Sequence, residues 1–107
     1  MDDRTITKLC AQAMGCTDTL DTVWDSRAKP PVPHMLYRLD GQWRNFDPLH
    51  DDAQAMALVK KFGLMLTQDI VPAEWRAEAN NFVGRSPDLN RAICECIAQM
   101  MKAKSAA

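Results

Sequence analysis

The spacing of apolar side chains predicts a short amphipathic helix at the start of the chain, over residues 3–14. Asp3 or Thr5 is available as its N-cap, and Gly15 follows as a stop signal. The apolar positions that define this helix are Ile6, Leu9, Cys10, Ala13 and Met14.

A second helix is predicted from Asp47-Pro48 to Gly63. Aspartate accepts hydrogen bonds from the free amides of a first turn, and proline is tolerated at the first helical position. Lys60 and Lys61 fall in the last turn, where positive charge suits the helix dipole. This helix is therefore expected to end at the glycine.

The last predicted helix has the cleanest apolar stripe in the chain. Ser86-Pro87-Asp88 is typical of a capped start, and the pattern runs to about Lys102. Residues 103–107 are expected to fray. The stripe consists of Leu89, Ile93, Cys96, Ile97 and Met100.

The strongest strand signal is a hairpin of residues 34–39 and 42–46 around Asp40-Gly41, a dipeptide that suits a two-residue type I′ turn. Strand alternation indicates which side chains of this hairpin face the core: Met35, Tyr37, Leu39 and Phe46. The predicted cross-strand pairs are Leu39 with Gln42, Arg38 with Trp43, Tyr37 with Arg44, and Met35 with Phe46.

A second hairpin is predicted from residues 64–71 and 75–80, with Trp75, Ala77 and Ala79 on one face. The segments between the regular elements are a long surface loop, residues 16–33, pinned by Trp24, and a shorter loop, residues 80–85. The order is helix, hairpin, helix, hairpin, helix. It predicts a single α+β domain over residues 1–107, with an antiparallel sheet of about four strands sandwiched by helices.

Bulk composition narrows the class of protein. The 107 residues are 47% hydrophobic and 25% charged, which is ordinary for a globular domain, and the formal net charge of −1 provides no global attraction to nucleic acid or anionic membrane. No apolar run approaches the roughly 20 residues of a membrane span, and the polar start does not resemble a signal peptide. The expected compartment is the cytoplasm.

The four cysteines are read as free thiols, because no secretion signal points to an oxidising compartment. The spacings of Cys10 with Cys16 and of Cys94 with Cys96 are both poor for a zinc site. Cys94 and Cys96 are two residues apart on a helix, so their side chains diverge by about 200°. No metal and no cofactor is expected. Cys10 and Cys96 lie on apolar stripes, which leaves Cys94 as the predicted more reactive thiol.

A thiol enzyme would need a cysteine beside His34 or His50, with an acid such as Asp51 or Asp52 to orient the imidazole. Nothing in the spacing demands that arrangement. The acidic group around the second helix start reads first as helix capping. The expectation is therefore a protein without catalytic residues.

Two groups of residues are candidates for binding. Aromatic and guanidinium groups on the first hairpin resemble the pairing that stacks on bases and contacts phosphate, although the same residues can simply hold a sheet together. The start of the last helix could offer free amides and arginines to an anion, although it can equally be an ordinary capped start. The hairpin group is Tyr37, Arg38, Trp43 and Arg44, and the anion group is Arg85, Ser86 and Arg91.

The segment Phe46-Asp47-Pro48-Leu49-His50-Asp51-Asp52-Ala53, continued to Val59, resembles small uncharacterised proteins of tailed bacteriophages and prophages in the phage ABA sandwich group. The likeness continues through Trp75-Arg76-Ala77-Glu78 and Ser86-Pro87-Asp88-Leu89, and covers roughly the last 60 residues plus the first helix. It implies a phage or prophage origin and a sandwich of helices and sheet. It carries over no catalytic residue.

These observations favour a phage accessory protein that binds a protein partner of the phage or the bacterial host, or a second copy of itself. Seven methionines, including Met100-Met101, are available for an adaptable apolar contact surface. The alternative is a weak nucleic-acid binder that uses the aromatic and basic hairpin.

Overall fold

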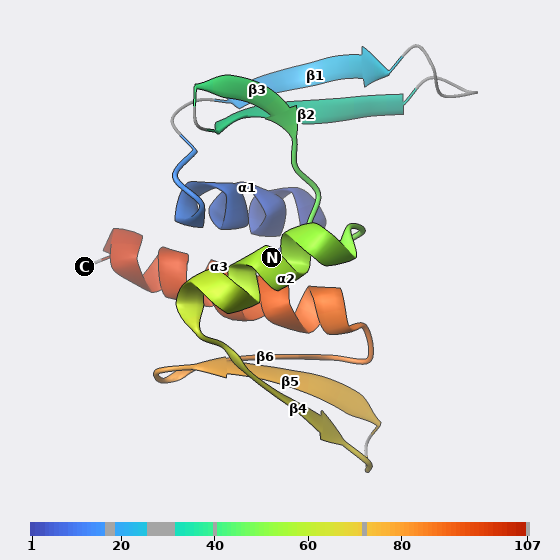
Figure 1. Cartoon of the computed structure of the whole chain (residues 1–107), viewed down its shortest axis with the longest axis vertical. Helices are drawn as coiled ribbons and strands as arrows, with labels where there is room; N and C mark the ends of the chain where they lie inside the picture. The colour runs from blue at the N-terminus through green and yellow to red at the C-terminus, as the bar shows by residue number, and fades with distance from the viewer. Residues whose placement is uncertain (17–18, 26–31, 40, 72, 107) are drawn as a thin grey trace.

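The structure, a computed structural model, describes residues 1–16, 19–25, 32–39, 41–71 and 73–106. It is α+β, as predicted, but its layers are reversed: two separate antiparallel sheets enclose a layer of helices (Figure 1). Each sheet has three strands, so the single sheet of about four strands sandwiched by helices is not confirmed. The elements are α1 (Asp3–Ala13), β1 (Thr19–Asp25), β2 (Val32–Leu39), β3 (Gln42–Asn45), α2 (Asp52–Phe62), β4 (Met65–Asp69), β5 (Glu74–Ala79), β6 (Phe82–Ser86) and α3 (Leu89–Ala106).

Sheet A consists of β1, β2 and β3 in that order. The predicted pairs of Leu39 with Gln42, Arg38 with Trp43 and Tyr37 with Arg44 are confirmed. The fourth pair is wrong, because the ladder closes at Leu36 with Asn45 and Phe46 leaves the strand. Tyr37 and Phe46 are both buried, as predicted for the core face, and their rings meet edge to face with centroids 5.9 Å apart.

Strand β1 corrects the prediction of a long loop over residues 16–33. It pairs with β2, and its register shifts between Leu20 and Val23. A bulge of this kind interrupts alternation, which removes the two-residue period that identifies a strand in a sequence. Residues 17–18 and 26–31 of the predicted loop, and the side chain of Trp24, lie outside the described part of the chain.

The helix starts also differ from the predictions. Helix α1 is capped by Asp2, whose carboxylate accepts a hydrogen bond from the Thr5 amide at 2.8 Å, rather than by Asp3 or Thr5. Helix α2 begins at Asp52 and not at Asp47-Pro48, because Asp51 has the extended backbone of an N-cap and accepts from the Gln54 amide. Its end is confirmed: Gly63 has a φ of 64°, a left-handed conformation that glycine adopts readily.

Sheet B consists of β4, β5 and β6. Strand β6 occupies the region predicted as the loop of residues 80–85, where the glycine at position 84 weakened the strand pattern. Trp75, Ala77 and Ala79 share the face that packs against the core, as predicted. The opposite face of the sheet is open to solvent.

Helix α3 forms the centre of the molecule. It packs against β5 and β6 on one side and against α1 and α2 on the other (Figure 1). The buried surface of the helix is therefore wider than the predicted apolar stripe. The helix also continues to Ala106, although residues 103–107 were expected to fray. Its buried residues surround much of the helix: Ala92, Ile93, Cys94, Cys96, Ile97 and Ala98. Within the described residues, no helix has the length and hydropathy needed to cross a bilayer.

Gly84 allows β6 to approach α3 unusually closely. A Cβ atom at this position would overlap the Ala92 carbonyl oxygen and lie 2.7 Å from the Cys96 amide nitrogen. Both atoms belong to the helix backbone, so no side-chain rotation would relieve the overlap. A side chain at position 84 requires the whole helix to move away from the sheet.

We predict that Gly84→Ala lowers the free energy of unfolding by about 3 kcal/mol, because the methyl group overpacks a rigid contact between two backbones. Urea unfolding followed by circular dichroism measures this change. Gly63→Ala is the matched control: its Cβ meets no atom within 4 Å, so only the positive φ is penalised, by about 1 kcal/mol. Equal losses in the two variants would contradict the close-contact explanation.

Candidate functional site

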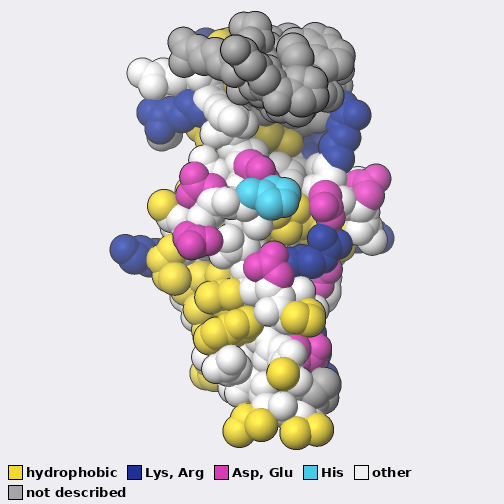
Figure 2. All heavy atoms as spheres, turned by 90° about the vertical axis from the view of Figure 1, so that its right-hand side faces the viewer, with side chains coloured by type: hydrophobic (Ala, Val, Ile, Leu, Met, Phe, Trp, Pro, Cys, Tyr) yellow, Lys and Arg dark blue, Asp and Glu magenta, His cyan; other side chains and the backbone are white. Residues whose placement is uncertain are grey.

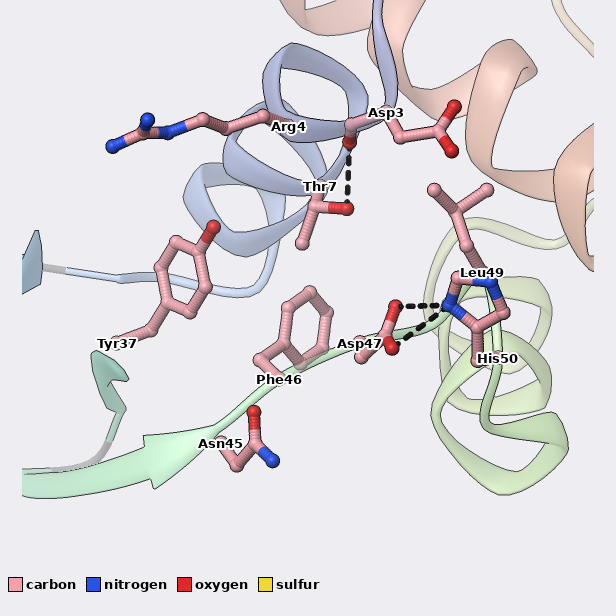
Figure 3. Close-up of a pocket in the computed structure, with 9 residues that line it drawn as sticks. All are labelled: Asp3, Arg4, Thr7, Tyr37, Asn45, Phe46, Asp47, Leu49 and His50. Atoms are coloured by element: carbon pink, nitrogen blue, oxygen red, sulfur yellow. Dashed lines mark hydrogen bonds and ion pairs between the residues drawn. The ribbon is translucent and has the colours of Figure 1, made fainter. Parts of the chain in front are cut away.

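A cleft of about 190 Å³ lies between α1 and the segment that joins β3 to α2 (Figure 3). Asp3, Arg4 and Thr7 line it from α1. Tyr37 and Phe46 project into it from the side of sheet A, so its floor is aromatic and its rim is polar.

Asp47 and His50 form the best-defined polar pair at this cleft. The imidazole Nδ1 lies 2.9 Å from a carboxylate oxygen of Asp47. Gln54 fixes the segment that carries the aspartate, because its side-chain oxygen accepts from the Asp47 amide at 2.6 Å and its side-chain nitrogen donates to the Asn45 carbonyl at 3.2 Å. The pair is largely open to water, with 74% of the His50 side chain exposed.

A carboxylate that holds Nδ1 of an imidazole leaves Nε2 to exchange protons, which is the base-orienting half of a nucleophilic site. The residues that line the cleft offer no thiol to complete it. The Thr7 hydroxyl donates to the Asp3 carbonyl of its own helix at 2.8 Å. The geometry thus supports polar contacts at the cleft rim more directly than chemistry.

Three of the four thiols lie in the core. Cys10 and Cys94 meet between α1 and α3, with the Cys10 Sγ 3.5 Å from the Cys94 carbonyl oxygen, and the Cys96 Sγ lies 3.5 Å from the Phe82 carbonyl oxygen. The hydrogen bond with Cys94, together with burial, raises the pKa of Cys10 far above its usual range, and burial raises the pKa of Cys96. The prediction that Cys94 is the more reactive thiol is wrong, because Cys94 is fully buried.

The first hairpin does not present its four candidate residues on one surface. Arg38 and Trp43 stand opposite each other on the outer face, with Trp43 42% exposed, whereas Tyr37 is buried on the inner face. Arg44 is exposed on the edge strand and donates to the Gln42 side-chain oxygen at 3.0 Å. Strand alternation therefore leaves Trp43 and Arg38 together on the outer face, and places Arg44 on the face that carries Tyr37.

The three residues of the predicted anion site are also dispersed. Arg91 lies beside two carboxylates, with Asp3 at 2.6 Å and Glu95 at 3.1 Å. Ser86 is buried and its hydroxyl accepts from the Asp88 amide at 3.1 Å. Arg85 lies on the outer face of sheet B opposite Arg76. These residues do not converge on one point.

The most exposed apolar side chains were not predicted as a site. Met65, at the start of β4, is 65% exposed, and Ile70 and Val71, in the turn after β4, are 87% and 90% exposed. Small groups of hydrophobic side chains are accordingly exposed at the end of the molecule formed by sheet B (Figure 2). The available signal was Ile70-Val71 directly before Pro72, an apolar pair at a turn position where polar residues are usual. We refer to Met65, Ile70 and Val71 as the β4 surface.

Comparisons with protein-family models, with curated proteins and with solved structures gave no match. Within the described residues, no three His, Cys, Asp or Glu side chains converge as metal ligands would. Function must therefore be inferred from the chain's own surfaces.

We predict that native protein treated with iodoacetamide is alkylated promptly at one cysteine, Cys16, which is half-buried where the other three thiols are buried. Buried thiols react only when the chain opens. Peptide mass spectrometry identifies the labelled positions, and denatured protein should carry four labels. Prompt labelling of Cys94 in the native protein would contradict this core arrangement.

Alkaline pH should destabilise the fold. In the unfolded chain a thiol ionises above about pH 8.5, whereas the raised pKa keeps Cys10 protonated in the folded chain. The stabilisation is therefore complete below that pH and declines above it, by about 1.4 kcal/mol per pH unit for each such thiol. Urea unfolding between about pH 7.5 and about pH 9.5 measures the slope, which should be shallower in Cys10→Ala. An unchanged slope in the variant would show that Cys10 does not contribute.

Proposed function

We propose that the chain is a non-enzymatic protein-interaction module that binds its partner through the β4 surface. The observation that carries this proposal is the exposure of Met65, Ile70 and Val71 on one strand and the turn that follows it. Isolated exposed apolar residues are normal, but large apolar side chains gathered on one element are typical of a surface that another protein covers.

A second candidate function is weak binding of single-stranded nucleic acid by the first hairpin. Its support is the exposed ring of Trp43 opposite Arg38 on the outer face of the hairpin. Such binding would weaken steeply with salt, because each phosphate contact releases counterions, whereas an apolar contact responds little. The burial of Tyr37 removes one of the two stacking rings, which makes this candidate the weaker one.

The proposed setting is the cytoplasm of a bacterial host. It is supported by the resemblance of the segment from Phe46 to Val59 to phage and prophage proteins of the phage ABA sandwich group. In that setting the chain would act as a phage accessory protein, with a partner from the phage or the host.

Affinity capture from prophage-induced bacterial lysate tests the proposal. We expect a stoichiometric protein that is retained after nuclease treatment and lost in the double variant Ile70→Ser with Val71→Ser, since two apolar contacts are removed. Trp43→Ser is the matched control, because it removes an exposed apolar side chain from sheet A and should retain the partner. Mass spectrometry of the eluates measures both.

Recovery that depends on nucleic acid and is lost in Trp43→Ser would overturn the proposal in favour of the hairpin. Recovery that is equal in wild type and in the Ile70 and Val71 double variant would place the partner elsewhere on the molecule.

A further inference from the structure

We propose that the β4 edge pairs antiparallel with the β4 edge of a second copy of this chain, which joins two B sheets into one six-stranded sheet. This inference rests on the proposed function and names its partner. It begins from the position of β4, which has β5 on one side and no described strand on the other.

The β4 edge is short and ends at the charged Asp69, but it lacks the other features by which edge strands usually prevent pairing. The strand Met65–Asp69 contains no lysine, arginine or proline, and its register with β5 runs without a bulge. Helix α3 packs on β5 and β6, and β4 is the strand of sheet B farthest from the helices (Figure 1). The helix layer therefore leaves this edge open.

The backbone of β4 directs hydrogen-bonding groups outward at alternate residues. The turn between β5 and β6 has two residues and closes on Ala79 with Phe82, a pair that exchanges hydrogen bonds in such hairpins. Alternate residues of β5 consequently bond to β4, and their partners there are Met65, Thr67 and Asp69. Leu66 and Gln68 then direct their N–H and C=O groups away from β5, where a second strand can form hydrogen bonds with them.

Side-chain matching selects the register. In a two-fold antiparallel pair, opposed residues must lie on the same face, so the axis passes through one residue of β4. With the axis at Gln68, apolar residues meet apolar residues and polar residues meet polar residues. In this pairing Ile70 and Val71, which lie in the turn after β4 in the single chain, become extended and lengthen the strand. The resulting pairs are Gln68 with Gln68 of the second copy, Thr67 with Asp69 of the second copy, Leu66 with Ile70 of the second copy, and Met65 with Val71 of the second copy.

The neighbouring registers match less well. With the axis at Thr67, the Asp69 carboxylate would stand opposite Met65 of the second copy and Ile70 opposite the already buried Leu64. With the axis at Gln68, no like charges are directly opposed, and a threonine hydroxyl can donate to each aspartate. This arrangement also gives each residue of the β4 surface an apolar side chain of the second copy as its cross-strand neighbour.

Sedimentation equilibrium of the full chain tests the dimer. From about 1 µM to about 500 µM, the mass should rise from 12.0 kDa toward twice that value, as expected for a small interface. Gln68→Pro should remain a monomer throughout this range, because proline removes an outward N–H without removing a bond to β5. Gln68→Ala, which keeps the N–H, should dimerise within about threefold of wild type. Circular dichroism confirms that both variants are folded.

A charge exchange tests the register without relying on proline. Met65→Lys alone and Val71→Glu alone should each weaken dimerisation at least about tenfold, because each leaves a charge against an apolar residue. The two substitutions together should restore most of that loss, since the new charges are opposed across the axis in the proposed register. Additive losses in the double variant would overturn the register.

A folded wild-type chain that stays at 12.0 kDa over the whole concentration range would overturn the dimer, as would a dimer that Gln68→Pro does not affect. These failures are distinct from failure of the proposed function. A monomeric chain that still captures a different protein through Ile70 and Val71 would retain the interaction module and reject self-pairing.

Discussion

The close contact between α3 and β6 at Gly84 is the constraint on which the rest of the structure depends. Because the helix backbone lies where a Cβ atom at position 84 would be, the sheet reaches the helix at a distance that no other residue type allows. Helix α3 then buries one face against sheet B and another against α1 and α2. Among the described side chains, Tyr37 of sheet A and Phe46, which follows β3, belong to the core around this centre.

This arrangement determines which residues are available to act. The thiols that suggest chemistry in the sequence instead fill space around α3. There a hydrogen bond with Cys94, together with burial, raises the pKa of Cys10, and burial raises the pKa of Cys96. The arginine that suggests an anion site, Arg91, instead links α3 to Asp3. The proposed function therefore rests on a surface at the periphery of the molecule, the β4 edge, which is away from these residues.

Local signals in the sequence predicted the elements whose structure is locally determined. The Asp40-Gly41 dipeptide predicted the register of β2 and β3 that the structure has, and Gly63 ends α2 as expected. Strand β6 and the full burial of α3 could not be predicted in the same way, because Gly84 reads as a loop residue until the helix above it is known. The β4 surface was missed for a related reason: exposure of Ile70 and Val71 depends on where the turn begins, and the apolar run suggested a longer strand.

Native-state hydrogen exchange tests the central role of α3 most directly. If the contact at Gly84 holds the molecule together, the α3 amides around Ile93 and Ile97 should exchange only through global unfolding, with opening free energies equal to that from urea unfolding. Amides of sheet A should open at lower free energy, because the strands of sheet A pack against the helices less extensively than β5 and β6 do. Exchange of the α3 amides before those of sheet A would contradict this account.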